Sequence, residues 1–171
     1  MEGECDIVYQ LGTAKFGARN DDATLNEEKL RKICQNHHVR MIEIKLSQGA
    51  KPGKGGILPA EKVTKEIAEI RGIPEGIAAI SPNRHVDASN SEELLDLIGQ
   101  VRRVSERPTG IKLCIGNPLP IRDFLEAINT RGKESAPDFI VVDGGDGGTG
   151  AAPLPLIDNT GLTVRESLPL M

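Results

Sequence analysis

Short apolar segments alternate with helical segments along the whole chain, and this alternation leaves few folds open to it. Apolar, β-branched runs predict strands at residues 6–11, 38–47, 77–81, 110–115 and 138–142. The first four are followed by amphipathic segments with capping residues at their starts and glycine or proline at their ends. Such an order predicts a parallel sheet covered by helices. With no repeat and no linker in 171 residues, we expect a single domain over residues 1–171.

Composition argues against several classes of protein. The 21 Lys and Arg residues are outnumbered by 25 Asp and Glu, which disfavours a nucleic-acid partner. No apolar run approaches the ~18 residues of a membrane span, and the acidic start does not resemble a signal peptide. The three cysteines form no CxxC pair, so we expect no zinc site, no disulfide framework and a cytoplasmic location. Aromatic residues make up only 2%, too few for stacking to be the main way of holding a ring.

Two glycine-rich loops follow predicted strands, at residues 48–56 and 144–150. In parallel α/β folds, ligands bind at the carboxyl ends of strands, and glycine lets backbone N–H groups approach an anion or a flat ring. The first loop lacks the spacing of a nucleotide P-loop, and its Lys51 and Lys54 suit either an anion or a solvated surface. The second loop matches GxGxxG in letters, but prolines follow where that motif needs a helix.

Charged residues near strand ends are the other candidates for chemistry. Lys112 interrupts an apolar strand, so its ammonium either points at an anionic ligand or reaches solvent from an edge strand. Asp143 and Asp146 suit metal ions or acid–base work, but turn and capping hydrogen bonds explain them equally well. His85 follows the third predicted strand, at the end where ligands bind. The three histidines show no ligand spacing, so we expect no metal site.

Several ordered motifs resemble the synthase domain of glutamate synthase, and most closely the stand-alone branch of the FMN-binding glutamate synthase family. In chain order they are IKLSQGAKPGKGG at 44–56, ISP at 80–82, IKL at 111–113 and DGGTGAAP at 146–153. The likeness extends from residue 6 to about residue 168. It implies an α/β fold of the (β/α)8 TIM-barrel type, which takes about 250 residues when complete. We therefore expect an incomplete barrel with about five βα units.

The resemblance also implies an activity and roles for particular residues. It points to an FMN-dependent oxidoreductase that converts a 2-oxo acid, such as 2-oxoglutarate, through an imino acid to an amino acid, such as glutamate. By motif position, Gln48, Lys51 and Arg71 meet the dicarboxylic substrate, and a dianion does need such cations. Lys112 is placed beside the flavin, where a positive charge stabilises the reduced ring. The wall of the flavin pocket is expected from Asp146, Gly147, Gly148, Thr149 and Gly150.

The chain also departs from the family pattern. Ile57 stands where larger members have glutamine, so we expect one substrate contact to be missing. No cysteine follows the GGTG segment, so we expect no iron–sulfur cluster in this chain. The flavin-phosphate loops of the last barrel strands are absent as well. We therefore expect weak FMN binding, or none, by these 171 residues alone.

Two other interpretations compete with this one. A catalytically inactive half-barrel would expose two sheet edges and act as an oligomerising or interaction module. Its partner would be a second copy or a complementing chain, in place of the small-molecule substrate. A five-stranded flavodoxin-like domain suits the length better, but its phosphate loop would be residues 12–17, where Thr13 is the only hydroxyl residue.

Overall fold

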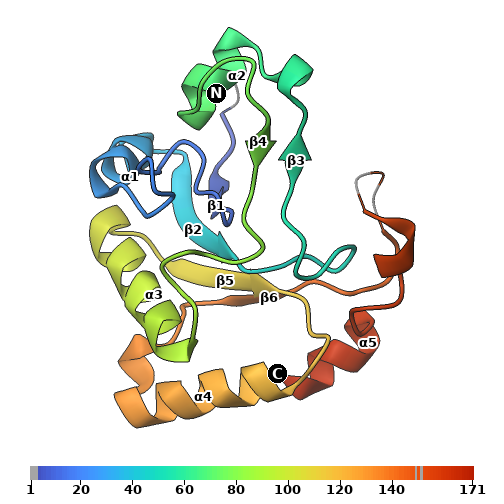
Figure 1. Ribbon diagram of the computed structural model, residues 1–171. Helices are drawn as coiled ribbons and strands as arrows, with labels where there is room; N and C mark the ends of the chain where they lie inside the picture. The colour runs from blue at the N-terminus through green and yellow to red at the C-terminus, as the bar shows by residue number, and fades with distance from the viewer. Residues whose placement is uncertain (1–3, 149, 151) are drawn as a thin grey trace.

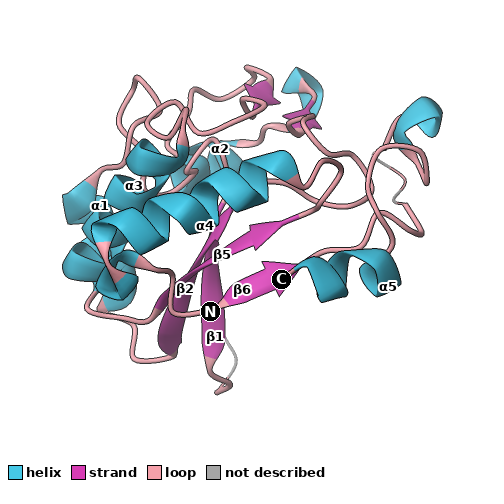
Figure 2. Cartoon of the chain, turned by 90° about the horizontal axis from the view of Figure 1, so that it is seen from below, coloured by secondary structure: helices cyan, strands magenta, loops and turns pink. Residues whose placement is uncertain are grey.

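The centre of the protein is a four-stranded parallel sheet covered by helices on one face. The computed structural model describes residues 4–148, 150 and 152–171. In spatial order the strands are β1 (Ile7–Leu11), β2 (Val39–Lys45), β5 (Thr109–Leu113) and β6 (Ile140–Val142). The covering helices are α1 (Glu27–Cys34), α3 (Ser91–Ser105) and α4 (Leu119–Arg131) (Figures 1 and 2). All strand pairs in this sheet are parallel, which confirms the predicted α/β class and gives a partial fold of the TIM-barrel type.

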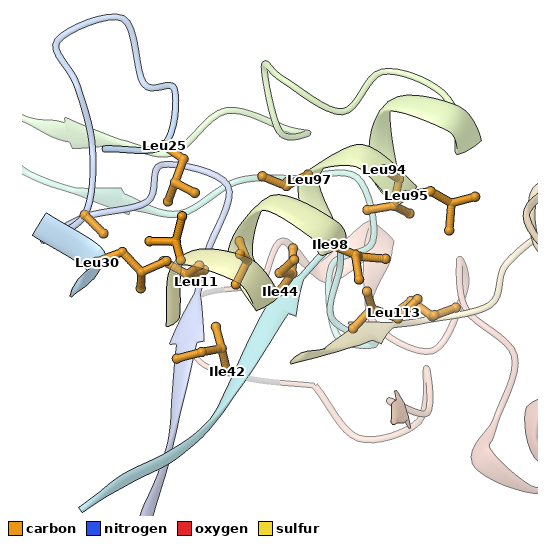
Figure 3. Packing of buried hydrophobic residues seen from close by; sticks show 14 of the residues in the cluster. Leu11, Leu25, Leu30, Ile42, Ile44, Leu94, Leu95, Leu97, Ile98 and Leu113 are labelled. Atoms are coloured by element: carbon orange, nitrogen blue, oxygen red, sulfur yellow. The ribbon is translucent and has the colours of Figure 1, made fainter. Parts of the chain in front are cut away.

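The main core lies between the sheet and these helices and is almost entirely aliphatic (Figure 3). Ile42 and Ile44 of β2 and Ile98 of α3 are fully buried in it. Leu95 and Ile98 lie one turn apart on α3, so the helix presents one apolar stripe to the strands. Phe124 is the aromatic residue in this cluster of buried side chains, as the low aromatic content of the sequence leads one to expect.

Local capping signals set where the helices begin. Asn90 caps α3 by accepting the backbone N–H of Glu93 at 2.9 Å, and Ser89 donates to the Glu93 carboxylate. Asn90 and Glu93 are therefore the residues that cap this helix. A short helix near the end of the chain, α5 (Val164–Ser167), has a capping box of its own.

The predicted strand at residues 77–81 is wrong as a member of the parallel sheet. Only β4 (Ala79–Ile80) is extended there, and it pairs antiparallel with β3 (Ile57–Leu58) in a separate two-stranded ribbon. Because β2 pairs directly with β5, the parallel sheet has no place for an additional strand between them. The main sheet therefore holds four strands, where the sequence predicted five.

Residues 57–80 form an arm that projects from the sheet (Figure 1). The helical part of the arm is divided into the short turn η1 (Ala60–Lys62) and α2 (Lys65–Arg71). The remaining short 3-10 turns are η2 (Lys133–Ser135), η3 (Leu154–Leu156) and η4 (Leu168–Leu170). The arm has a small core of its own, with Val63 and Ala68 buried in it. None of the helices described is long and apolar enough to cross a membrane.

Candidate functional site

The sheet face opposite the helices carries polar and charged side chains; we call it the open face. Side chains alternate along a strand, so Ile44 points to the helices while Glu43 and Lys45 point to the open face. The register pairs Gln10 with Glu43 and Lys45 with Lys112 across neighbouring strands. The side chain of Gln10 donates a hydrogen bond to Glu43. Lys112 therefore lies on the open face, on the inner strand β5, and not on an edge strand.

Positive charge gathers at the carboxyl end of this face. Burial lowers the pKa of Lys45, and the charges of Lys112 and Lys51 lower it further. Lys112 Nζ lies 3.7 Å from Asp143 Oδ2, and its side chain keeps 24% of its exposure. The charges on these three lysines are therefore only partly compensated by the carboxylates around them. An anion at this position would relieve the repulsion between the lysines.

The structure brings two of the three predicted substrate residues to these lysines. Gln48 Oε1 accepts a hydrogen bond from Lys45 Nζ at 2.5 Å, and Lys51 is 8% exposed in the same loop. Arg71 lies elsewhere, at the end of α2, where its guanidinium is 5.0 Å from the centre of the Phe16 ring. A role for Arg71 in substrate binding stays a prediction.

The two glycine-rich loops meet beside the lysines, and their contact admits no side chain. Gly49 N–H donates to Asp143 Oδ2 at 3.0 Å, and a Cβ on Gly49 would lie 1.5 Å from Gly144 O. At the other end of the first loop, a Cβ on Gly55 would lie 1.9 Å from Ser81 O. Residues 48–56 are thus held between the segment after β6 and the segment after β4. Glycine is required at both contacts because backbone passes directly against backbone.

A small polar cavity lies at this junction. Its volume is about 90 Å³, and its walls come from the ends of β1 and β2, the first glycine-rich loop and the segment after β4. The polar groups that line it include Thr13, Lys45, Ser47, Gln48, Lys54 and Asn83. The cavity offers cations, amides and hydroxyls in a small space, which suits a carboxylate or another small anion.

A second, larger cavity of about 580 Å³ lies on the helix side, between the starts of α3 and α4. Leu94, Ile121 and Phe124 line it, and its described walls contain none of the three lysines of the open face. Burial raises the pKa of the Cys114 thiol in its wall, so this cysteine is a weak nucleophile. The chemistry of the chain is therefore concentrated on the open face.

Asp146 stabilises the loop in which it lies. Its Oδ1 accepts the backbone N–H of Val164 at 3.1 Å, at the start of α5. From the sequence, such a capping hydrogen bond was one alternative for Asp146, and metal binding or acid–base chemistry was the other. Asp143 is bound to the first glycine-rich loop and lies near Lys112, as described above. Within the described part of the chain, no three His, Cys, Asp or Glu residues are grouped to hold a metal ion.

The remaining predicted flavin-wall residues follow Asp146 directly. Gly147 and Gly148 have positive φ angles of 104° and 107°, which favour glycine. Gly147 N–H donates to Asp158 Oδ1 at 2.9 Å. Gly150 leaves open space where a Cβ would be, and Thr149 lies outside the described residues. Gly147 and Gly150 have open space beside them, whereas Gly148 packs against the Ile157 side chain, and contact with a flavin stays a prediction.

His85 holds the backbone of Lys45 in place, a role that the sequence does not reveal. Its side chain is 2% exposed, and Nε2 lies 2.9 Å from the backbone oxygen of Lys45. A carbonyl can only accept, so Nε2 carries the proton and donates. Burial first, and then the nearby charge of Lys15, lower the pKa of His85 to about 4. A neutral imidazole therefore fixes the backbone at Lys45.

A buried ion pair holds the segment that carries His85. Lys15 Nζ lies 2.6 Å from Asp87 Oδ1, and the Lys15 side chain is completely buried. Close by, Thr13 Oγ1 donates to Pro82 O at 2.6 Å. The loop after β1 and the segment after β4 are thus joined on either side of His85. The sequence gives no sign of this role of Lys15, because nothing in its neighbours indicates a partner 72 positions away.

Fold and site together define an α/β domain of the TIM-barrel type with a cationic site at the carboxyl end of its sheet. Residues 1–170 match the family model described as "Conserved region in glutamate synthase". The chain therefore belongs to this family and is a glutamate-synthase-related domain, as the motifs predicted.

Individual relatives agree with the family match. The chain is 37% identical over 171 residues to the glutamate synthase large subunit-like protein YerD of Bacillus subtilis. The matched region covers 100% of this chain and 32% of YerD. It is 38% identical to the archaeal glutamate synthase [NADPH] of Methanocaldococcus jannaschii, over 95% of this chain and 28% of that protein. An archaeal-type glutamate synthase [NADPH] of Thermotoga maritima is 42% identical over 94% of this chain and 28% of its own length. The chain thus spans about a third of the length of these relatives.

Proposed function

We propose that residues 1–171, as one partial barrel domain, form the substrate- and flavin-facing part of an FMN-dependent glutamate-synthase-like oxidoreductase. The observation that carries this proposal is the convergence of Lys45, Lys51 and Lys112 beside two glycine-rich loops on the open face. Family membership and the names of the relatives support the same reaction class. The reaction is the reductive amination of a 2-oxo acid, such as 2-oxoglutarate, through an imino acid.

The lysine group supplies the binding energy for a dicarboxylic 2-oxo acid. Each carboxylate needs cationic or N–H donors, and Lys45, Lys51 and the Gln48 amide offer them in one place. Partial burial strengthens these contacts, because the effective dielectric is lower there than in water. The ion pair with Asp143 keeps Lys112 close to Lys45. This pair does not neutralise the site, because the site contains further lysines. Binding of a dianion is therefore the first step that this face can perform.

In this proposal, the isoalloxazine ring of FMN lies against the open face. The reduced ring is anionic and is stabilised by a nearby cation, which Lys112 offers on this face. Bound in its reduced form, FMN would supply the hydride that reduces a carbon–nitrogen double bond. The contribution of the chain is to place the substrate by its carboxylates, to hold positive charge near the ring and to keep Lys45 in position through His85.

Calorimetric titration of the purified 171-residue chain with 2-oxoglutarate tests the substrate part of the proposal. We expect Lys45→Met to weaken binding about tenfold, since a charge-assisted hydrogen bond contributes about 1.5–3 kcal/mol. Lys133→Met is the matched control, because Lys133 is exposed in η2, on the helix side. Equal affinity for the two variants would contradict the proposed site, provided that circular dichroism shows both to be folded.

Titration with FMN tests the flavin part separately. Because the flavin-phosphate loops are absent, we expect FMN to bind only weakly, so a change in the flavin absorption spectrum should appear only at high FMN concentration. That change should be lost in Lys112→Met and kept in Lys133→Met. A spectrum that stays unperturbed at high FMN concentration would contradict the flavin assignment. It would leave the dicarboxylate site standing, since that assignment depends on Lys45.

A further inference from the structure

The carboxylate of Asp143 lies between the two halves of the candidate site. Its backbone N–H donates to Leu113 O at 2.9 Å, which fixes this residue at the end of β6. Its Oδ2 accepts the backbone N–H of Gly49 at 3.0 Å. The same oxygen lies 3.7 Å from Lys112 Nζ on the neighbouring strand β5. One carboxylate oxygen therefore joins the first glycine-rich loop to the lysine of the inner strand.

The hydrogen bond to Gly49 orients the turn that carries both substrate candidates of this loop. A peptide unit is planar, so the N–H of Gly49 and the C=O of Gln48 turn together. Gln48 O in turn accepts the backbone N–H of Lys51 at 3.3 Å. Gly49 is buried, so water cannot easily replace an acceptor that is removed. The position of Gln48 and Lys51 thus depends on the Asp143 carboxylate.

Asp143 is also a counter-charge for the lysines of the open face. Burial lowers the pKa of Lys45, and the positive charges of Lys112 and Lys51 lower it further. The negative charges of Asp143 and Glu43 raise it in part. However, a carboxylate beside an anion site repels the anion. As a counter-charge alone, Asp143 would weaken the binding of a dicarboxylate, whereas as a support for the turn it would strengthen it.

We propose that Asp143 is a positioning residue, which holds the turn of Gln48 and Lys51 in a fixed place relative to Lys112 through the Gly49 N–H. It acts through these residues and does not itself bind the substrate. The inference rests on the proposed function for the choice of 2-oxoglutarate as a probe. The support of the turn by Asp143 requires no ligand, so the two can fail separately.

Hydrogen exchange of the Gly49 amide, followed by NMR without ligand, tests the support of the turn. Asp143→Asn keeps an oxygen acceptor on a side chain of the same shape and should leave this amide protected. Asp143→Ala should speed its exchange about tenfold, because the N–H loses its acceptor. Lys112→Met should speed it by a smaller factor, since the carboxylate is then held less firmly. Asp123→Ala is the matched control, because it removes an exposed carboxylate from α4 and should leave Gly49 unchanged.

Calorimetric titration with 2-oxoglutarate separates positioning from the effect of charge. Asp143→Asn loses a repelling charge and keeps the turn, so it should bind at least as tightly as the original chain. Asp143→Ala loses the same charge but should bind about tenfold more weakly than Asp143→Asn. In both variants binding should be lost at a lower pH than in the original chain. Lys45 must be protonated to hold an anion, and both variants lack the nearby charge that raises its pKa.

Two outcomes would overturn the proposal. Equal exchange of the Gly49 amide in Asp143→Asn and Asp143→Ala would show that the acceptor does not hold the turn. Equal affinity of these two variants for 2-oxoglutarate would leave Asp143 as a counter-charge only. If the original chain does not bind 2-oxoglutarate, the proposed function fails, and the exchange rates still decide the role of Asp143. If Asp143→Ala does not fold, as judged by circular dichroism, Asp143→Ser takes its place, because its shorter side chain withdraws the oxygen from Gly49 and should speed exchange in the same direction.

Discussion

His85 is a buried side chain whose protonation state is set by the groups around it. Nε2–H donates to the Lys45 carbonyl, and Nδ1 is buried with no hydrogen-bond partner among the described residues. A second proton would therefore put an N–H without an acceptor next to the buried Lys15 ammonium. The neutral form is favoured by geometry as well as by burial, and this makes the fold sensitive to acid.

We predict that His85 makes the protein less stable as the pH falls from 6.5 to about 4. An unfolded histidine has a pKa of 6.5, whereas burial lowers the pKa of His85 in the folded protein to about 4. Between these values the unfolded chain binds the extra proton. The contribution is thus fully present above 6.5 and is lost by about 4, and it amounts to about 3 kcal/mol. Urea unfolding at a series of pH values measures it.

The variant His85→Gln separates this effect from the titration of carboxylates. Glutamine keeps an N–H donor for the Lys45 carbonyl but does not titrate, so its stability should change less over the same pH range. The difference between the two pH profiles is the His85 contribution. Parallel profiles would show that the imidazole is protonated equally easily in the folded and unfolded chains.

The sequence predicts residue-level features that depend on local pattern and misses those that depend on distant pairing. Lys112 was expected either to face an anionic ligand or to reach solvent from an edge strand. Its strand β5 lies between β2 and β6, so the edge-strand interpretation is wrong, and contact with a ligand stays a prediction. The family resemblance placed Gln48 and Lys51 at one site, and the structure brings both to Lys45. The ion pair of Lys15 with Asp87 joins segments 72 residues apart, so no local pattern could indicate it.

At the scale of elements, the two glycine-rich loops shape the site by their mutual contact. We predict that Gly49→Ala weakens 2-oxoglutarate binding and destabilises the fold by about 1–3 kcal/mol, because an added methyl group forces a packed contact apart. Its Cβ would lie 1.5 Å from Gly144 O. Calorimetry and thermal unfolding of the variant measure the two effects.

Gly12→Ala is the control for this prediction. Gly12 lines the small polar cavity beside the first glycine-rich loop, but nothing lies within 4 Å of the position that its Cβ would occupy. We expect this variant to unfold at nearly the same temperature as the original protein. A Gly49→Ala protein as stable as Gly12→Ala would show that the loops separate at little cost and do not depend on close contact.

Elements with strong periodic or capping signals could be predicted from the sequence. Elements whose position depends on which strands become neighbours in the sheet could not. The amphipathic stripe of α3 and the glycine that ends α2 are legible in the sequence, and the structure confirms them. Residues 77–81 have the composition of a strand, but membership of a sheet is decided by which strands lie next to each other. Here β5 occupies the place beside β2, so β4 pairs with β3.

At the scale of the whole molecule, the apolar side chains form two separate clusters. The main cluster joins the sheet to α1, α3 and α4, and Ile98 is fully buried in it. The second belongs to the arm, where Val63, Ala68 and Ala79 are the buried members. The arm begins directly after the first glycine-rich loop, so its motions reach the candidate site through backbone continuity.

We predict that the arm opens independently of the sheet, because three buried residues give it far less stabilisation than the main core receives. Hydrogen exchange should show the amides of α2 exchanging much faster than those of α3. Val63→Ala should speed exchange in α2 and leave α3 unchanged, whereas Ile98→Ala should cost about 2–5 kcal/mol and speed exchange in both. Equal protection of α2 and α3 in the original protein would mean that the two clusters unfold as one unit, and the arm could then not move while the cationic face stays ordered.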